Sequence, residues 1–155
     1  MVRQILAMAG IWAGIFIGLC SQMAMAQNEL PPGSKPLSKI LQLLEQKKIQ
    51  PARVVLDDRK WVVDGLTNKE SVRLHVDPRT GRITQRETIP DLDPVEGALP
   101  VSRILEKLEA ARPGPVRGVR YQKKRWLVET HNGKVTTEIQ VSAETGNLLM
   151  GRDEN

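Results

Sequence analysis

Apolar residues recur with helical spacing in two stretches of the chain. In each stretch they fall at positions i, i+3, i+4 and i+7, starting at Leu37 in the first and at Val101 in the second, which continues to Ala111. Polar and charged residues occupy most of the opposite face, so the pattern predicts two amphipathic helices that each bury one stripe. Pro51 ends the first helix, because proline lacks the amide hydrogen that a helix needs. The Arg-Pro-Gly-Pro run at residues 112–115 ends the second.

Three short runs rich in β-branched or alternating residues follow each helix. They cover residues 53–56, 60–63 and 72–76 in the first case, and residues 117–122, 125–130 and 135–141 in the second. In the third run, apolar residues alternate with Arg73 and His75, as in a strand with one buried face. Asn132-Gly133 is a strong hairpin signal. The sequence therefore predicts an α+β fold of two tandem α-β-β-β units, each with one helix packed on a three-stranded antiparallel sheet.

The ends of the two units match residue by residue. Val76–Ile83 reads Val-Asp-Pro-Arg-Thr-Gly-Arg-Ile, and 65 residues later Val141–Leu148 reads Val-Ser-Ala-Glu-Thr-Gly-Asn-Leu. The same offset links Trp61 to Trp126. Glycine after threonine supplies a positive φ that other residues resist, which predicts a tight turn after each third strand.

The helices repeat as well, with an offset of 64 residues. Ser38 matches Ser102, and Glu45 matches Glu109. This internal repeat divides the chain, since each copy is expected to be one structural unit. We expect a first repeat at 35–84, a linker with two prolines at 85–97, a second repeat at 98–150 and a tail at 151–155.

The N-terminal residues 1–26 have the layout of a signal peptide. A short apolar run, Ile11–Leu19, precedes Ala24-Met25-Ala26, which places small residues before a cut after Ala26. An uncleaved anchor is the alternative, although the run is short for a membrane span. A lipid anchor at Cys20 is disfavoured, because Leu19 stands where lipoprotein signals use a small residue. We expect an extracytoplasmic location, in the periplasm or, alternatively, in the medium after secretion.

Cleavage would leave a mature chain without cysteine and with a formal net charge of +4 instead of +5, since Arg3 is the only charged residue removed. Such a chain must be held together by packing, without disulfides. Residues 27–34 follow as a flexible lead-in rich in proline and glycine, and Ser34 is expected to cap the first helix.

This order of elements resembles a tandem pair of PepSY domains. The first copy carries the string Val76–Ile83, preceded by the strand Lys60–Val63, whereas the second departs from it with Ser142-Ala143-Glu144 in place of Asp-Pro-Arg. The resemblance implies an α+β unit found in exported bacterial proteins. Related units occur in the propeptides of thermolysin-type metalloproteases, where inhibitory and folding roles are attributed to them. The family offers no catalytic residues to carry over.

The residues themselves give little sign of catalysis. The two histidines, His75 and His131, are far apart in sequence and belong to no metal-binding motif, and the mature chain has no cysteine. No Gly-x-Ser-x-Gly elbow is present, and Gly133-Lys134 lacks the rest of a phosphate-binding loop. We therefore expect no enzyme activity, no metal and no cofactor. Trp61 and Trp126 are expected to fill the core rather than to form a binding surface.

A cluster of basic residues distinguishes the second unit, because the equivalent region of the first is diluted by Asp57 and Asp58. The cluster runs across the end of the second helix and the first hairpin, and consists of Arg112, Arg117, Arg120, Lys123, Lys124 and Arg125. One interpretation is a solvated basic hairpin. The other is a contact surface for an acidic protein or for the anionic envelope surface. Nucleic acid is not expected as a partner in an exported compartment.

The sequence as a whole predicts an exported, non-catalytic protein-binding module. The first hypothesis is a modulator or inhibitor of a secreted or envelope peptidase, which acts through a sheet edge or a surface loop. The alternative is an accessory or ligand-sensing module of envelope signalling that meets an anionic partner through the basic hairpin. Each unit is small enough to be marginally stable alone, so we expect the repeats to pack on each other or on a partner.

Overall fold

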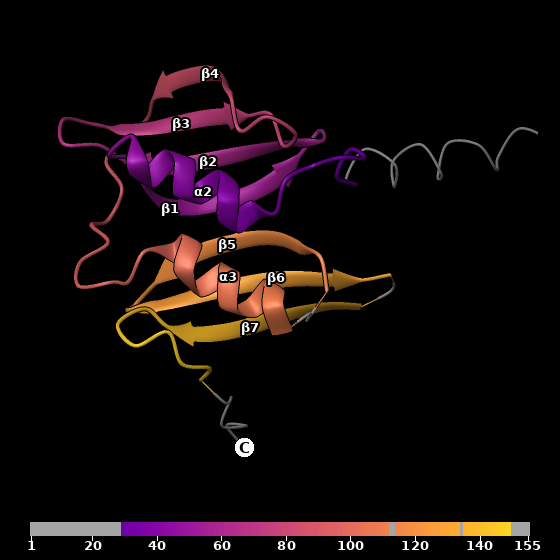
Figure 1. Cartoon of the computed structure of the whole chain (residues 1–155). Helices are drawn as coiled ribbons and strands as arrows, with labels where there is room; N and C mark the ends of the chain where they lie inside the picture. The colour runs from indigo at the N-terminus through magenta and orange to yellow at the C-terminus, as the bar shows by residue number, and fades with distance from the viewer. Residues whose placement is uncertain (1–28, 112–113, 134, 150–155) are drawn as a thin grey trace, which may run out of the picture.

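The computed structural model describes residues 29–111, 114–133 and 135–149. In chain order the elements are α2 (Leu37–Gln46), β1 (Gln50–Asp57), β2 (Lys60–Leu66), β3 (Ser71–Val76), β4 (Ile83–Thr88), α3 (Val101–Ala111), β5 (Val116–Gln122), β6 (Arg125–Asn132) and β7 (Val135–Ser142). All seven strands belong to one antiparallel sheet in the order β4-β3-β2-β1-β5-β6-β7, and both helices lie on the same face of it (Figure 1).

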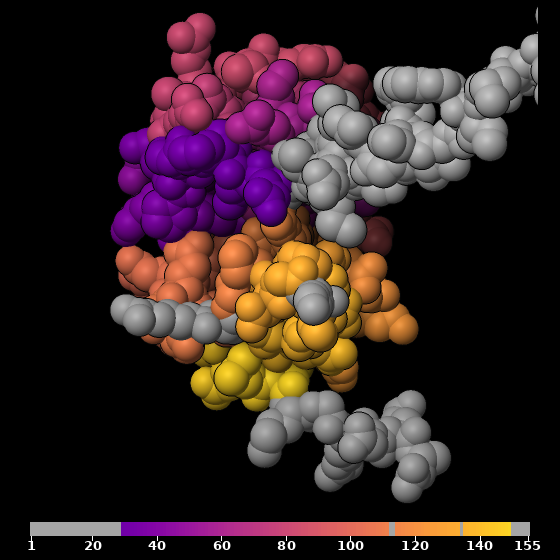
Figure 2. Space-filling view, turned by 90° about the vertical axis from the view of Figure 1, so that its right-hand side faces the viewer, coloured from indigo at the N-terminus to yellow at the C-terminus, as the bar shows by residue number. Residues whose placement is uncertain are grey.

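The prediction of two separate helix-plus-three-strand units is wrong. The first strands of the two units, β1 and β5, pair with each other in antiparallel fashion, with Val54 opposite Val119. Left apart, each of these strands would be an open sheet edge, and their pairing satisfies both rows of backbone groups. The two halves therefore form one continuous body (Figure 2).

Strand β4 adds a fourth strand to the first half. It occupies the last residues of the predicted first repeat and the beginning of the predicted linker at 85–97. All its residues after Ile83 are exposed, so the apolar alternation that marks a half-buried strand is missing from this segment. The sheet is consequently asymmetric, with four strands from the first half and three from the second.

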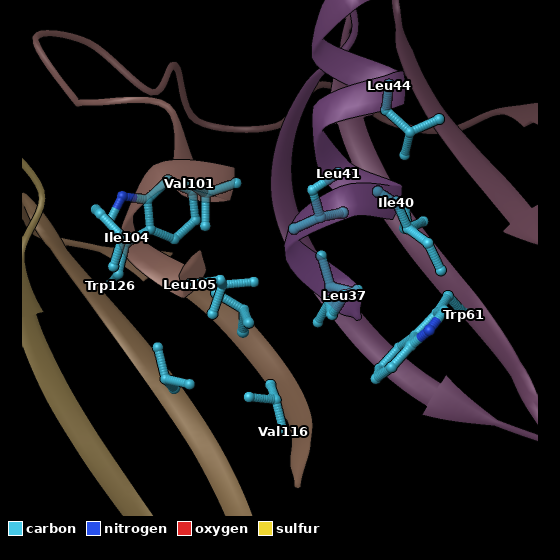
Figure 3. Close-up of a cluster of buried hydrophobic side chains, with 14 of the residues drawn as sticks. Leu37, Ile40, Leu41, Leu44, Trp61, Val101, Ile104, Leu105, Val116 and Trp126 are labelled. Carbon is cyan, nitrogen blue, oxygen red and sulfur yellow. The ribbon is translucent and has the colours of Figure 1, made fainter. Parts of the chain in front are cut away.

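The predicted core positions are confirmed. Trp61 is fully buried and Trp126 is 2% exposed, and the i, i+3, i+4, i+7 positions of both helices are buried, although Ala111 is exposed. Figure 3 shows Trp61 beside the first helix, and Trp126 beside Val101 and Ile104 of the second. Buried residues of both halves belong to one hydrophobic cluster, so the chain has a single core.

The two helices cap each other across the repeat. The backbone N–H of Ser38 in α2 donates to Glu109 Oε1 of α3 (3.1 Å), and the N–H of Ser102 in α3 donates to Glu45 Oε1 of α2 (3.2 Å). Each serine hydroxyl also donates to the second oxygen of the same carboxylate. The helices are therefore antiparallel neighbours, and each carboxylate satisfies first-turn N–H groups that have no partner inside their own helix.

The predicted cap at Ser34 is wrong. Its hydroxyl donates instead to the carbonyl of Pro31 (2.6 Å), and α2 begins after Pro36 without a side-chain cap at that residue. The carboxylate of Glu109 takes over this role from the other half of the chain.

The two Thr-Gly turns have the same geometry, as the repeat predicts. Gly81 has φ +75° and Gly146 has φ +71°, and each donates its N–H to the carbonyl four residues earlier (2.8 Å in both). In the first turn, Asp77 Oδ1 also accepts the N–H groups of Arg79 (2.7 Å) and Thr80 (3.2 Å). These backbone hydrogen bonds hold the pKa of Asp77 below its ordinary value.

Each turn also fixes the chain that leads into a helix. The N–H of Lys35 donates to Pro78 O (2.8 Å), and the N–H of Leu99 donates to Ala143 O (2.7 Å). The third strand of each half is thus tied to the start of its own helix.

Three glycine-to-alanine substitutions, at the two turns and at Gly97 in the linker, should separate backbone strain from crowding. Gly97 has φ +64° with open space around it, a Cβ at Gly146 would lie 3.4 Å from Leu99 Cδ1, and a Cβ at Gly81 would lie 2.7 Å from Leu43 Cδ1. A positive φ costs a residue with a Cβ about 1–2 kcal/mol. We expect Gly97→Ala and Gly146→Ala to lower the free energy of unfolding by about that amount, and Gly81→Ala to lower it further. Urea denaturation gives the three values, and an equal loss at all three sites would show that Leu43 yields without cost.

Candidate functional site

The six predicted basic residues do not form one continuous patch. Arg112 lies outside the described residues. Arg117 stands at a β-bulge of β5, where its Nη1 is buried without a hydrogen-bond partner among the described residues. Arg120 follows on β5, Lys123 and Lys124 form the two-residue turn to β6, and Arg125 begins β6.

Two cations of this hairpin, Arg120 and Lys124, are already paired with carboxylates. Arg120 Nη2 lies 3.0 Å from Glu138 Oε2 on β7, and Lys124 Nζ lies 3.2 Å from Glu144 Oε1 in the turn after β7. Arg125 Nη1 donates to Gln140 Oε1 (3.2 Å). These side chains are largely exposed, so each pair contributes little to stability. They nevertheless reduce the charge that the hairpin could offer to an acidic partner.

Sequence reasoning missed Arg53, which joins the basic residues on the open face of the sheet. Arg53 on β1 is directly opposite Arg120 on β5, on the face that the helices leave uncovered. Like charges in such a cross-strand pair are unfavourable. Between them and Glu129 the surface is hollowed by about 250 Å³, with Gly118 and Leu127 in the floor. No local signal in the sequence marks this pair, because it exists only through the β1–β5 contact.

The two outer edges of the sheet differ in chemistry. At the β4 edge, the Glu70 carboxylate accepts hydrogen bonds from Arg86 Nη2 (2.7 Å) and from Thr88 Oγ1 (2.9 Å). These two bonds hold the pKa of Glu70 below its ordinary value. Arg86 and Glu87 also place charge in the middle of the strand, which is one way in which proteins protect an edge from pairing with other chains.

The β7 edge has less of this protection. Its sequence, Val-Thr-Thr-Glu-Ile-Gln-Val-Ser, is rich in β-branched residues and has one charged residue, Glu138. On the outer side, Leu149 N donates to Gln140 O and Asn147 O accepts from Ser142 N, both at 2.8 Å. These bonds show that even-numbered residues of β7 direct their backbone groups outward. The N–H and C=O groups of Thr136 and Glu138 therefore face outward without a backbone partner in the described chain.

Exposed apolar residues lie at the two ends of this edge. In the described part of the chain, the exposed large hydrophobic side chains are Val135 (61%), Leu148 (61%) and Leu149 (36%). Val135 begins β7, and Leu148 forms an isolated bridge with Val141 at its other end. Exposed apolar side chains thus lie at both ends of β7, with the unpaired backbone groups of Thr136 and Glu138 between them.

A second hollow, of about 290 Å³, lies where α2 ends and α3 begins. Ile49, Val95, Leu99, Val101 and Trp126 form most of its apolar wall, and Gln50 Nε2 donates to Val95 O (2.8 Å), which fixes the linker beside it. In the described ranges, no three His, Cys, Asp or Glu side chains gather closely enough to hold a metal ion. None of the described helices is long and apolar enough to cross a membrane.

Comparisons with known proteins find little that resembles this chain. No family model matches it, and no curated protein matches it. Among solved structures, it is similar to a crystal structure described as that of a candidate lipoprotein from Clostridium difficile 630. The two chains are 15% identical with a TM-score of 0.46, over 77% of this chain and 93% of that one. A likeness this distant does not bear on function.

Proposed function

We propose that this chain is an exported, non-catalytic protein-binding module of the PepSY type, which modulates a secreted or envelope peptidase by binding an extended segment of it along β7. The observation that carries the proposal is the open β7 edge, where the outward-facing backbone groups of Thr136 and Glu138 lie between exposed Val135 at one end and exposed Leu148 at the other. The signal-peptide pattern at residues 1–26, which lies outside the described residues, supports the extracytoplasmic location.

Strand addition suits this edge for physical reasons. The backbone groups of an open edge strand supply affinity for any extended segment, and the side chains on alternate positions supply specificity. The β4 edge is a poorer candidate, because Arg86 and Glu87 disfavour the approach of another strand. The peptidase as partner rests on the PepSY resemblance, whereas the strand edge rests on the geometry.

A second candidate function is supported by Arg53 and Arg120. Arg120 is already paired with Glu138, and a carboxylate or another anionic group of a partner at Arg53 would further relieve the unfavourable juxtaposition of the two arginines on the open face. This surface would bind the anionic partner of the alternative hypothesis. It lies in the middle of the sheet, however, and not at the hairpin turn. Binding there would weaken steeply with salt.

The test is capture from extracytoplasmic extract by the immobilised mature chain, residues 27–155, with elution by rising salt and identification by mass spectrometry. The edge variant is Glu138→Pro, which removes one outward N–H and leaves the bonds to β6 in place. Its matched control is Glu138→Gln, which loses the pair with Arg120 but keeps the N–H. We expect a peptidase that is retained through high salt and loses activity when bound, and at least tenfold weaker binding by Glu138→Pro than by Glu138→Gln.

Two results would count against strand addition. Equal binding by the proline and glutamine variants would exclude the edge as the binding surface. A partner that elutes at low salt, and that is lost in the double variant Arg53→Gln/Arg120→Gln, would favour the anionic partner instead.

A further inference from the structure

The internal repeat relates the β7 edge to the β3 edge, and in the described part of the chain only the β3 edge carries a further strand. Strand β7 is the counterpart of β3, since Val141 follows Val76 by the same 65 residues that separate the two tryptophans. In the first half, Val76 pairs with Ile83, and β4 continues from there along the outer edge of β3. In the second half, Val141 bridges to Leu148, the counterpart of Ile83. In the described part of the chain, no strand continues from Leu148 along β7.

We infer that the outer edge of β7 is a strand position of defined direction and register, and that its occupant is an extended segment of the partner protein. That the partner is a peptidase rests on the proposed function. By the repeat, the segment runs antiparallel to β7. In the first half, Val72, Arg73 and Leu74 of β3 each have a partner on β4. Their counterparts on β7 are Thr137, Glu138 and Ile139, so the segment has three residues opposite these.

Differences between the two halves define the side chains of this segment. Arg73 faces Glu87 on β4, with 4.0 Å between Nη1 and Oε1, whereas its counterpart on β7 is Glu138, of opposite charge. Glu138, which is paired with Arg120, is also opposite a second carboxylate, that of Glu129 on β6. A basic residue opposite Glu138 would balance this charge.

The neighbouring positions call for apolar residues. In the first half, Arg86 and Thr88 of β4 bind Glu70. The counterpart of Glu70 is Val135, which is 61% exposed, so the polar partner is replaced by apolar surface. A segment with the pattern apolar-basic-apolar, read opposite Ile139, Glu138 and Thr137, therefore fits the edge of β7.

Two other occupants are less well matched. In the same register, the residues of this chain that would fall on the three positions are Gly151, Arg152 and Asp153. Arg152 suits Glu138, but glycine and aspartate are poor strand formers and leave the apolar positions unfilled. A second copy that presents its own β7 would bring another Glu138 toward the cross-strand carboxylates of Glu138 and Glu129.

The inference can be tested without knowledge of the partner by building the missing strand into the chain. Residues 150–155 are replaced by Gln-Val-Arg-Val-Thr, which places arginine opposite Glu138. Matched controls replace them by Gln-Val-Glu-Val-Thr or by Gly-Ser repeats. We expect the arginine version to raise the Tm by about 3–6 °C over the Gly-Ser version, a shift typical of a modest gain in the free energy of unfolding for a domain of this size. The glutamate version should gain less than half of that.

The outcomes separate the inference from the proposed function. If the arginine version is no more stable than the Gly-Ser version, or no more stable than the glutamate version, the assigned strand position is wrong whatever the chain binds. If it is more stable but still captures and inhibits the peptidase, the strand position stands and the proposed binding mode fails. A Tm loss of similar size in the Gly-Ser version, relative to the natural chain, would identify residues 150–155 as the occupant. A dimer that the arginine version dissociates, measured by light scattering, would identify a second copy.

Discussion

Replacement of Trp126 by alanine is expected to unfold both halves of the sheet in one transition. Trp126 is 2% exposed, and its ring packs edge-to-face on Tyr121, with 5.3 Å between the centroids. Truncation of a buried tryptophan to alanine costs about 3–5 kcal/mol, which is a large share of the stability of a small protein. Because β1 and β5 join the halves and one core spans them, the loss should not stay in the second half.

The variant provides its own reporter for this effect. In the mature chain, Trp126→Ala leaves Trp61 as the one remaining tryptophan, on β2 of the first half. We expect the denaturant midpoint from Trp61 fluorescence to fall together with the midpoint from circular dichroism, which reports the whole sheet. Val135→Ala, at a residue that is 61% exposed, is the control and should change the free energy of unfolding by less than about 0.5 kcal/mol. A Trp61 transition that stays at its natural midpoint would show two independently folding halves.

The features that the sequence predicts well are those whose signals lie within a few residues. The helical stripes and the turns at Gly81 and Gly146 depend on local spacing and on backbone conformation, and they are confirmed except at Ala111, which is exposed. The β1–β5 pairing joins residues about 65 positions apart, and nothing in either strand marks the other as its neighbour. The same holds for Arg53, whose relation to Arg120 follows from that pairing alone.

Strand β4 and the β7 edge illustrate a second limit. The residues of β4 after Ile83 are exposed, so their pattern cannot be told from a polar linker. The candidate edge of β7 can be recognised only when the two halves of the structure are compared. In the first half β4 lies outside β3, whereas the described second half has no strand outside β7. The basic residues were easier to find in the sequence, but the ion pairs of Arg120 and Lys124 show that composition alone overstates their free charge.

The carboxylates that cap the opposite helices can be predicted from the sequence only in part. The repeat makes the matches of Ser38 with Ser102 and of Glu45 with Glu109 visible in the sequence, but their meaning depends on the antiparallel contact of α2 with α3. Since Ser38 and Ser102 are 4% and 7% exposed, their N–H groups have little access to water as a substitute partner.

Removal of these carboxylates should therefore lower the free energy of unfolding, because the serine groups that they bind are buried. We expect Glu109→Ala to lower the free energy of unfolding by about 1–3 kcal/mol, because it leaves the N–H and hydroxyl of Ser38 buried without acceptors. Glu45→Ala should cost a similar amount through Ser102. Urea denaturation at neutral pH gives both values.

Glu106→Ala is the matched control for Glu109→Ala, since Glu106 lies one turn earlier in α3 and also reaches across to α2, where its Oε1 is 3.2 Å from Lys39 Nζ. Its side chain is 62% exposed, so its loss should cost no more than about 0.5 kcal/mol. Glu109→Gln keeps an acceptor for Ser38 and should recover part of what Glu109→Ala loses. If instead Glu109→Ala costs no more than Glu106→Ala, water replaces the carboxylate at the start of α2, and the two helices are joined by their apolar stripes alone.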